Sequence, residues 1–423
     1  MQEGKRSLAA SLAVIGVVLA AAGGHLARRQ VEIGPDAAAG TGLLRPGILA
    51  SNDQRVELSE SEYFYQLTQL LEKQYVDPVA DDAKLASGAV RGMVGSLIDP
   101  NSLHMSAEHF KSFQSQLAGK YEGIGVEIKY EFDKAELKKA QERARDIDSL
   151  LLIPDLKISA VMPGSPAERA GIRAGDRITR VSGKYLVSSR DVREIRALQT
   201  AVTDGKATPA ELEAYRREFV KRADNSIPVN KAREQLTSGI GKSMDIEWER
   251  DKTPGKATVE SVSTTVPPVV RQADGSYAIR LIKGAAKALK EVDLTKTLTI
   301  DLRNSGQGDF NQIRPLLELL VPAGTYGTLA TERPGTVRTL VTESGPKTSM
   351  PITLLVDSTT RGAAEVFALA LNGRRLARLS GGQMGGDRAW IEVISLPDGS
   401  GYTLTTAIFR PEIGKDVKVT QAK

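Results

Sequence analysis

Three histidines and no cysteine limit the chemistry available to this 423-residue chain. Without cysteine, thiol catalysis, disulfide bonds and cysteine-ligated zinc sites are excluded. None of His25, His104 and His109 stands in a metal-ligand spacing such as H-E-x-x-H. We therefore expect no metal site and no cofactor. A Ser-His-Asp triad could be built only through His104 or His109, and both lie in a polar, helix-like stretch that favours exposed, non-catalytic side chains.

Hydroxyl groups that could act as nucleophiles follow an apolar, strand-like segment in the second half of the chain. Ser358 and Thr360 are the candidates. A hydroxyl is a weak nucleophile unless a nearby base accepts its proton. No lysine lies between Lys347 and Lys415, and Arg388 cannot serve because a guanidinium keeps its proton in proteins. The local sequence therefore provides no base for either hydroxyl.

A glycine-rich loop that leads into a strand is a candidate peptide-binding site. It consists of Gly123, Ile124, Gly125 and Val126. A Gly-x-Gly loop can offer free backbone N–H groups to a terminal carboxylate, and the exposed strand edge beside it can accept an extended peptide as an added strand. We predict that these four residues bind C-terminal or extended peptides. The alternative is that the two glycines only form a turn.

Length and composition indicate a soluble protein of several domains. A chain of 423 residues exceeds one typical core, so two or three domains are expected. Apolar residues make up 41% and charged residues 26%, which is ordinary for globular proteins. The formal net charge of +5 includes no long Lys/Arg block, so nucleic-acid binding is not expected.

The N-terminus has the pattern of an export signal. Lys5 and Arg6 precede a nearly continuous apolar run over residues 8–24, which is shorter than a membrane-spanning helix prefers. An uncleaved signal anchor is the alternative. Either interpretation places the rest of the chain outside the cytoplasm, in the bacterial periplasm or cell envelope, with membrane contact only through this segment.

Periodic patterns predict helices first, then a strand-rich middle, then alternating strands and helices. Apolar spacing favours helices over residues 82–97 and 107–117. Two charged insertions, residues 134–148 and 191–222, are predicted to be helical, and strands over 243–250 and 257–262 are expected to join through 253–255. From residue 277 strands alternate with helices, which indicates a layered sheet. The expected class is a multidomain α/β protein.

Several of these stretches together resemble the carboxy-terminal processing peptidases, also called tail-specific proteases. The resemblance covers most of the chain beyond the N-terminal segment. The motifs that carry it, in chain order, are residues 75–78, 96–102, 123–126, 163–167, 170–172, 174–178, 299–304, 354–357 and 404–407. It implies a helical N-terminal region (58–120), a PDZ domain with helical insertions (121–266) and a layered α/β peptidase core (267–423). Residues 1–30 are then the signal and residues 31–57 a linker.

The same resemblance implies that the catalytic Ser-Lys dyad is absent. Active members carry a Ser-Ala-Ser-Ala-Ser-Glu stretch whose middle serine is the nucleophile, and a lysine about two dozen residues later is its base. Alignment on Glu365 places Gly362 at the nucleophile and Asp387 at the base. The auxiliary position at the end of the helix is Gly373. No catalytic residue is then expected, and Ser358 and Thr360 remain fallback nucleophiles.

The resemblance also implies an oxyanion loop. In such folds the oxyanion is bound by backbone N–H groups of a glycine-rich loop that follows a core strand, and by one near the nucleophile. Gly306 and Gly308 occupy that loop here. We expect them to preserve its geometry as a remnant that shapes a cleft for peptide without making a catalyst.

The leading hypothesis is a proteolytically silent envelope protein that binds C-terminal or unfolded peptide segments of envelope proteins through its PDZ domain. Adaptor proteins are further possible partners. The first alternative is an active serine endopeptidase that cleaves C-terminal tails with displaced machinery. The second is a structural envelope protein whose PDZ groove is blocked by the insertions.

Overall fold

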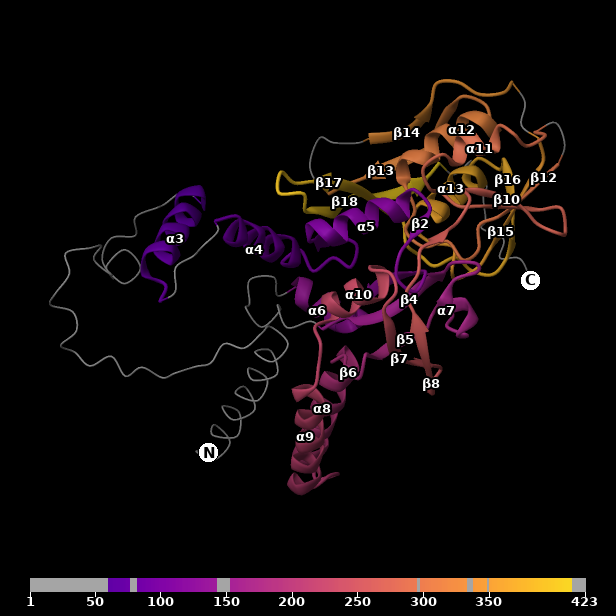
Figure 1. Cartoon of the computed structure of the whole chain (residues 1–423). Helices are drawn as coiled ribbons and strands as arrows, with labels where there is room; N and C mark the ends of the chain where they lie inside the picture. Colours follow the sequence, from indigo (N-terminus) through magenta and orange to yellow (C-terminus); the bar gives the residue numbers. More distant parts are fainter. Residues whose placement is uncertain are drawn as a thin grey trace.

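A computed structural model of the chain describes residues 60–76, 82–142, 153–294, 297–332, 338–347 and 350–412. The predicted signal, residues 1–30, and the predicted linker, residues 31–57, lie outside these residues. Within the described ranges, no helix is both long enough and apolar enough to cross a membrane. Figure 1 shows N-terminal helices followed by two sheet-containing parts, with the earlier part below the later one.

The N-terminal region is helical, as the sequence predicted. Its helices are α3 (Glu60–Gln74), α4 (Asp82–Gly95) and α5 (Ala107–Leu117). The Ser106 side chain caps α5 by accepting the backbone N–H of His109. Phe110 and Phe113 of α5 pack with Met105, which lies in the short strand β1 (His104–Met105). β1 pairs with the last strand of the chain, so this region is attached to the C-terminal part.

The first sheet is antiparallel, with strand order β3-β4-β5-β7-β8 and β6 beside β5. Its strands are β3 (Val126–Glu131), β4 (Asp155–Val161), β5 (Arg177–Val181), β6 (Lys184–Tyr185), β7 (Ser243–Arg250) and β8 (Thr253–Glu260). Among the described strands, β3 ends this order with β4 as its single neighbour. Its outer edge is therefore the place where another strand could be added.

One turn of this sheet differs from the sequence prediction. β7 and β8 join through Asp251 and Lys252, whereas we expected the join at residues 253–255. Both turn residues have positive φ angles, 49° and 68°, as a two-residue hairpin of the right twist requires. Pro254 and Gly255 were taken as turn signals, but they lie on β8 opposite Glu249 and Trp248.

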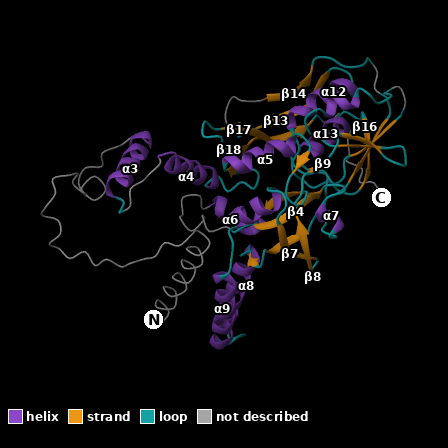
Figure 2. Ribbon diagram, in the orientation of Figure 1, coloured by secondary structure: helices purple, strands orange, loops and turns teal. Residues whose placement is uncertain are grey.

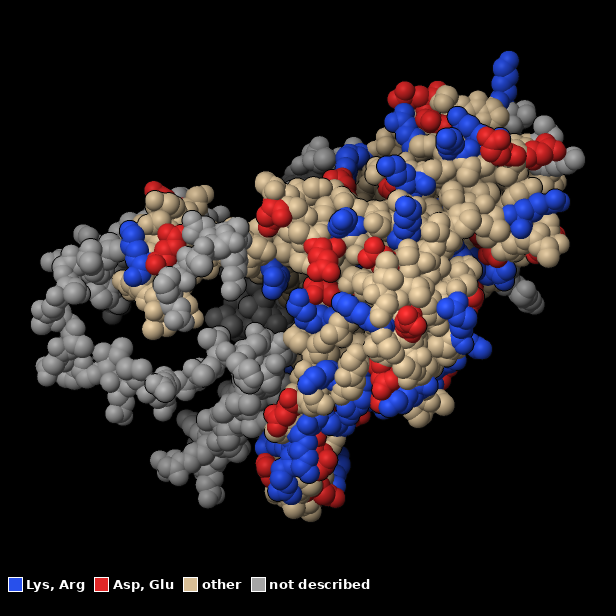
Figure 3. Space-filling model, viewed as in Figure 1, with Lys and Arg blue, Asp and Glu red and all other residues tan. Residues whose placement is uncertain are grey.

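Five helices accompany this sheet. They are α6 (Lys134–Glu142), α7 (Pro166–Arg169), α8 (Ser189–Thr203), α9 (Pro209–Asp224) and α10 (Val229–Thr237). α10 packs against β3 and β4. The inserted helices α8 and α9 form a hairpin that extends away from the sheet (Figure 1), and charges of both signs cover it (Figure 3). Ion pairs from Arg193 to Asp133 and from Arg196 to Glu136 connect α8 with α6 and the residue before it.

The C-terminal part contains two further sheets. The mainly parallel one has the order β10-β11-β12-β15-β16, and the antiparallel one has the order β1-β18-β13-β14 with β17 beside β18. The strands are β10 (Val269–Arg271), β11 (Tyr277–Ile279), β12 (Leu298–Asp301), β13 (Gly324–Ala330), β14 (Arg338–Thr342), β15 (Ile352–Val356), β16 (Ala377–Gly381), β17 (Ala389–Ser395) and β18 (Gly401–Pro411). A short pair, β2 (Lys120–Tyr121) and β9 (Thr264–Thr265), lies where the two parts join.

Helices pack with both of these sheets (Figure 2). They are α11 (Ala285–Leu289), the 3-10 turn η3 (Phe310–Gln312), α12 (Ile313–Leu320) and α13 (Gly362–Gly373). Nearly every side of α13 is buried, as expected of a helix without a polar face. α13 contacts β16 as well as β13, β17 and β18, so it lies within the largest apolar core cluster. The predicted α/β class is confirmed.

Candidate functional site

Gly362 opens α13 at a point where the backbone leaves no room for a side chain. It follows β15 and the loop 357–361, it is buried, and its φ angle is +54°. A Cβ atom there would lie 2.9 Å from the Cα atom of Gln307 and closer still to the Gln307 carbonyl oxygen. Residues other than glycine rarely adopt this φ, and this contact adds a backbone clash. Glycine is therefore the residue that fits at position 362 while the neighbouring loop keeps this conformation.

The glycine-rich loop beside Gly362 turns one backbone carbonyl, that of Gln307, toward the start of α13. The backbone N–H of Ala363 donates to the Gln307 carbonyl over 2.9 Å. A hydrogen-bond acceptor therefore occupies the space where an oxyanion would need donors. Gly306 and Gly308 do lie next to the start of α13, as predicted, since a Cβ on Gly308 would contact Ala363 at 3.1 Å. The N–H of Ala363, beside the nucleophile position, is therefore occupied, and the retention of the remaining oxyanion geometry by Gly306 and Gly308 stays a prediction.

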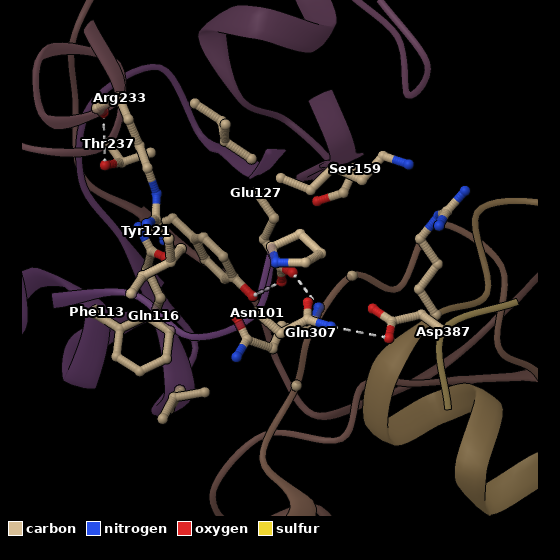
Figure 4. Close-up of a pocket in the computed structure, with 18 of the residues that line it drawn as sticks. Asn101, Phe113, Gln116, Tyr121, Glu127, Ser159, Arg233, Thr237, Gln307 and Asp387 are labelled. Atoms are coloured by element: carbon tan, nitrogen blue, oxygen red, sulfur yellow. Dashed lines mark hydrogen bonds between the residues drawn. The ribbon is translucent and has the colours of Figure 1, made fainter. Parts of the chain in front are cut away.

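The loop is held by a carboxylate from the first sheet. Glu127 of β3 accepts the backbone N–H of Gln307 over 2.8 Å and the hydroxyl of the buried Tyr121 over 2.9 Å (Figure 4). A second connection runs from Asn304, whose side-chain amide bonds both the N–H and the carbonyl of Val161 at the end of β4. Both halves of the molecule therefore determine where the loop 304–308 lies.

Asp387, at the position that the resemblance assigns to the base, is a carboxylate in a mostly dry setting. Burial raises its pKa, and the nearby charge of Asp99 adds to the rise. Its side chain accepts a bond from the amide of Asn101 over 3.3 Å. The backbone N–H groups of Gly386 and Asp387 donate to Glu365, whose pKa burial also raises. Glu365 therefore positions this loop against α13.

Replacing Asp387 with asparagine is expected to raise the free energy of unfolding at pH 7 by about 1 kcal/mol. The folded-state pKa lies above the ordinary 3.8, so the stability linked to this group is present below pH 3.8 and is lost as the pH rises through the folded value. The gain of the variant should therefore shrink as the pH falls through the folded-state pKa, and it should vanish below pH 3.8. Urea unfolding at several pH values measures it, and an equal gain at every pH would contradict the assignment.

The two fallback hydroxyls lie in different surroundings. Thr360 is fully buried, and its hydroxyl donates to the Leu302 carbonyl and accepts the N–H of Asp357. The Thr360 hydroxyl therefore stabilises the loop that precedes α13. Ser358 is exposed and lines a cavity of about 420 Å³ together with Lys129 of β3. The sequence provided no local base, but the fold brings this distant lysine to the same cavity.

Two backbone N–H groups of the predicted peptide-binding loop already donate hydrogen bonds within the protein. The N–H of Gly123 donates to the Gly239 carbonyl over 3.1 Å, and that of Ile124 donates to the Leu236 carbonyl over 3.0 Å. Both acceptors lie at or just beyond the C-terminal end of α10. The prediction that this loop offers free N–H groups is therefore wrong for these two residues. The position of Val126 at the start of the edge strand β3 leaves strand addition open.

His109 also differs from expectation. We predicted an exposed side chain, but α5 turns this face inward and His109 is buried. Its Nε2 atom lies 3.3 Å from the hydroxyl of Thr237 on α10. That hydroxyl donates its hydrogen to the Arg233 carbonyl, so Nε2–H must be the donor in this contact. His109 therefore connects the N-terminal helices to α10.

A cavity of about 750 Å³ lies where α5, β3, α10 and the C-terminal part meet (Figure 4). Glu127, Gln307 and Asp387 form part of its wall on the side of α13. Ile128 and Thr237 continue that wall between β3 and α10. A single opening thus extends from the edge strand β3 to the surroundings of Gly362.

Three stretches of the chain match known families in chain order. Residues 45–109 match the activating protease CtpB N-terminal domain, residues 157–206 the PDZ domain and residues 279–421 peptidase family S41. The carboxy-terminal processing protease CtpA of Bacillus subtilis is 28% identical over 328 residues, or 77% of this chain. The chain belongs to the carboxy-terminal processing peptidase family. The resemblance noted in the sequence is confirmed, and β5, α7 and most of β4 lie within the stretch that matches the PDZ domain.

Other relatives agree with this placement. CtpB of the same Bacillus strain is 23% identical over 84% of this chain, and the carboxy-terminal-processing protease of Bartonella bacilliformis is 24% identical over 88%. The matches span 60% of CtpA, 64% of CtpB and 75% of the Bartonella protein. The solved photosystem II D1 C-terminal processing protease shares the fold, with a TM-score of 0.56 at 19% identity, and the match covers 83% of this chain and 82% of that one.

Proposed function

We propose that this peptidase-family protein binds extended segments of other proteins without cleaving them, as an adaptor or regulator in the bacterial cell envelope. The observation that carries the proposal is Gly362, which has no side chain and lies against the Gln307 carbonyl. A serine enzyme that loses its nucleophile retains only residual catalysis, about a millionfold below the intact enzyme in a well-studied case. The export pattern of residues 8–24 supports the location.

The proposal that the protein binds peptides is supported by the PDZ match and by the edge of β3 that pairs with no described strand. An extended segment can add to that edge and continue into the cavity beside Gly362. Because two N–H groups of the Gly-x-Gly loop are occupied by α10, strand addition fits the site better than capture of a terminal carboxylate at that loop. Unfolded or C-terminal peptide segments of envelope proteins are the proposed partners.

An active peptidase with displaced machinery is the second candidate, because Ser358 and Lys129 line one cavity. Burial lowers the pKa of Lys129, and the charges of Arg361 and Lys157 lower it further. A lysine with a lowered pKa is a better base. However, an ion pair with Glu131 over 2.8 Å opposes loss of its proton. A structural protein with a closed PDZ groove is the third candidate. The backbone carbonyls at the end of α10 already accept two N–H groups of the Gly-x-Gly loop. The inserted α8–α9 hairpin extends away from the sheet.

Purified protein incubated with an unfolded protein that has an apolar C-terminus is expected to release no fragments above the buffer rate. The same assay is run on Ser358→Ala and Lys129→Gln, with Lys287→Gln on the exposed surface of α11 as the matched control. Cleavage by the wild type that both cavity variants abolish, and that the control keeps, would overturn the silent assignment. Calorimetric titration with the same peptides addresses the structural candidate, which predicts no binding.

A further inference from the structure

Arg361 is a charged side chain whose guanidinium group has no hydrogen bond or ion pair among the described residues. It stands immediately before Gly362, where the resemblance implies a small alanine. Its side chain packs over Gly385, at which an added Cβ atom would lie 2.8 Å from the guanidinium carbon. It lines both the 750 Å³ cavity and the 420 Å³ cavity. A long cation has thus been placed in the former catalytic surroundings and left available to a ligand.

The smaller cavity has an excess of positive charge. Three cations line it, Lys129, Lys157 and Arg361, against one carboxylate, Glu131. Burial opposes ionisation of Glu131, but hydrogen bonds from both lysines lower its pKa to about 2, so it is charged at neutral pH. The Glu131 carboxylate forms ion pairs with both lysines, with its oxygens 2.8 Å from Nζ of Lys129 and 2.7 Å from Nζ of Lys157. Among the residues that line this cavity, positive charges exceed negative charges by two, and the carboxylates of Asp387 and Glu365 interact with Arg361 from outside it.

The start of α13 adds to this surplus. Arg361 is the N-cap residue of the 12-residue helix, and its side chain makes no capping bond. The N-terminus of a helix carries a partial positive charge, so a cation there is unfavourable unless an anion joins it. The lowered pKa of Lys129, due first to burial and also to the charges of Arg361 and Lys157, reflects the same unbalanced field.

We propose that this cavity binds a carboxylate group of the bound peptide through Arg361 and Lys129. Arg361 can form a two-pronged contact with a carboxylate, and Lys129 can approach it from the β3 side. The exposed Ser358 hydroxyl makes no hydrogen bond among the described residues and supplies a further donor. This inference rests on the proposed function: β3 accepts the extended segment, and the cavity then takes either its C-terminal carboxylate or an Asp or Glu side chain.

The partly occupied Gly-x-Gly loop favours a carboxylate site elsewhere, in the cavity. Since the N–H groups of Gly123 and Ile124 are bonded to carbonyls of Leu236 and Gly239, a carboxylate would have to displace both contacts to bind there. At the other end of the same opening, Arg361 loses no existing bond when a carboxylate arrives. A carboxylate of the bound segment therefore displaces fewer existing bonds at Arg361 than at the glycine loop.

Calorimetric titration of the full chain with one extended apolar peptide in four forms tests the proposal. The forms carry a C-terminal acid or amide, each with Glu or Gln at one internal position. We expect the form with the recognised carboxylate to bind at least about tenfold more tightly than its neutral counterpart. A preference for the acid terminus identifies the α-carboxylate as the source, and a preference for Glu identifies a side chain.

The variants Arg361→Gln and Lys129→Gln should remove that preference, and Arg361→Lys should keep part of it. Arg410→Gln, at an exposed position on β18, is the matched control and should keep it all. Thermal unfolding of each variant verifies that it is folded. Binding of all four forms with equal affinity, or a preference unchanged in Arg361→Gln, would overturn the carboxylate site while the proposed function stands. Failure of every form to bind the wild type would overturn both.

Discussion

Replacing Gly362 with alanine is expected to lower the free energy of unfolding by about 2–4 kcal/mol. Two costs combine at this position. The φ angle of +54° disfavours any residue with a Cβ atom, and that atom would also press on the backbone of Gln307. Because Ala363 bonds the Gln307 carbonyl, the loop cannot retreat without breaking that contact. Urea unfolding followed by circular dichroism measures the change.

Gly275→Ala is the matched control for this prediction. Gly275 has a φ angle of +84° in an exposed turn, and nothing lies within 4 Å of an added Cβ atom. It should therefore cost only the conformational part, about 1 kcal/mol. If Gly362→Ala lowers the free energy of unfolding no more than Gly275→Ala does, the loop 306–308 moves aside easily. The contact between the Gln307 carbonyl and Ala363 would then not be a fixed property of the fold.

The same contact bears on any attempt to restore catalysis. The double change Gly362→Ser with Asp387→Lys supplies both side chains of the implied dyad, but the serine would meet the Gln307 backbone before it met a substrate. The loop is held from β3 by Glu127 as well. Restoration therefore requires the loop to turn over, so that its carbonyl leaves the N–H of Ala363 free.

Acidification from pH 6.5 to pH 4 is expected to destabilise the protein through His109 by about 3 kcal/mol. Burial, together with the charges of Arg233 and Lys231, lowers the folded-state pKa of His109 from 6.5 to about 3. The unfolded chain therefore binds a proton at this site below pH 6.5 while the folded chain does not. Stability falls as the pH falls, and the loss levels off near pH 3.

His109→Gln should flatten this dependence, because glutamine can donate to Thr237 without titrating. The pH profile of unfolding free energy is measured for the wild type, for this variant and for His104→Gln. The pKa of His104 is lowered by a smaller amount, so its variant should change the profile less. A wild-type slope that His109→Gln leaves unchanged would show that other groups cause the acid sensitivity.

Local signals predicted most secondary-structure elements well. Helices α5 and α9 begin where Ser106 and Thr208 cap them, and such caps act over three or four residues. The β7–β8 turn was misplaced because Pro254 and Gly255 are strong turn signals, whereas Asp251 and Lys252 adopt left-handed conformations that their residue types indicate only weakly. The burial of His109 was missed because polar neighbours in sequence conceal the one face of α5 that packs.

The candidate site was predictable only in part. The assignment of Gly362 and Asp387 to the nucleophile and base positions was made from the order of motifs along the chain, which can be read directly from the sequence. Lys129 and Glu127 could not be found in this way, because they reach the site from a strand of the first sheet more than 170 residues away in sequence. The only available signal for Arg361 was that a large cation stands where the resemblance implies alanine.

The order of residues fixes which side chains are present: it provides no cysteine, no lysine between 347 and 415, and glycine at position 362. These facts set the limits of the chemistry, because a missing functional group cannot be supplied by folding. Only the tertiary structure decided where the remaining donors and charges point. Whether Ala363 offers a free N–H, and whether Arg361 has a partner, depends on contacts between strands and loops far apart in the chain. Backbone hydrogen bonds and cavity electrostatics are properties of those contacts, which one-dimensional patterns do not encode.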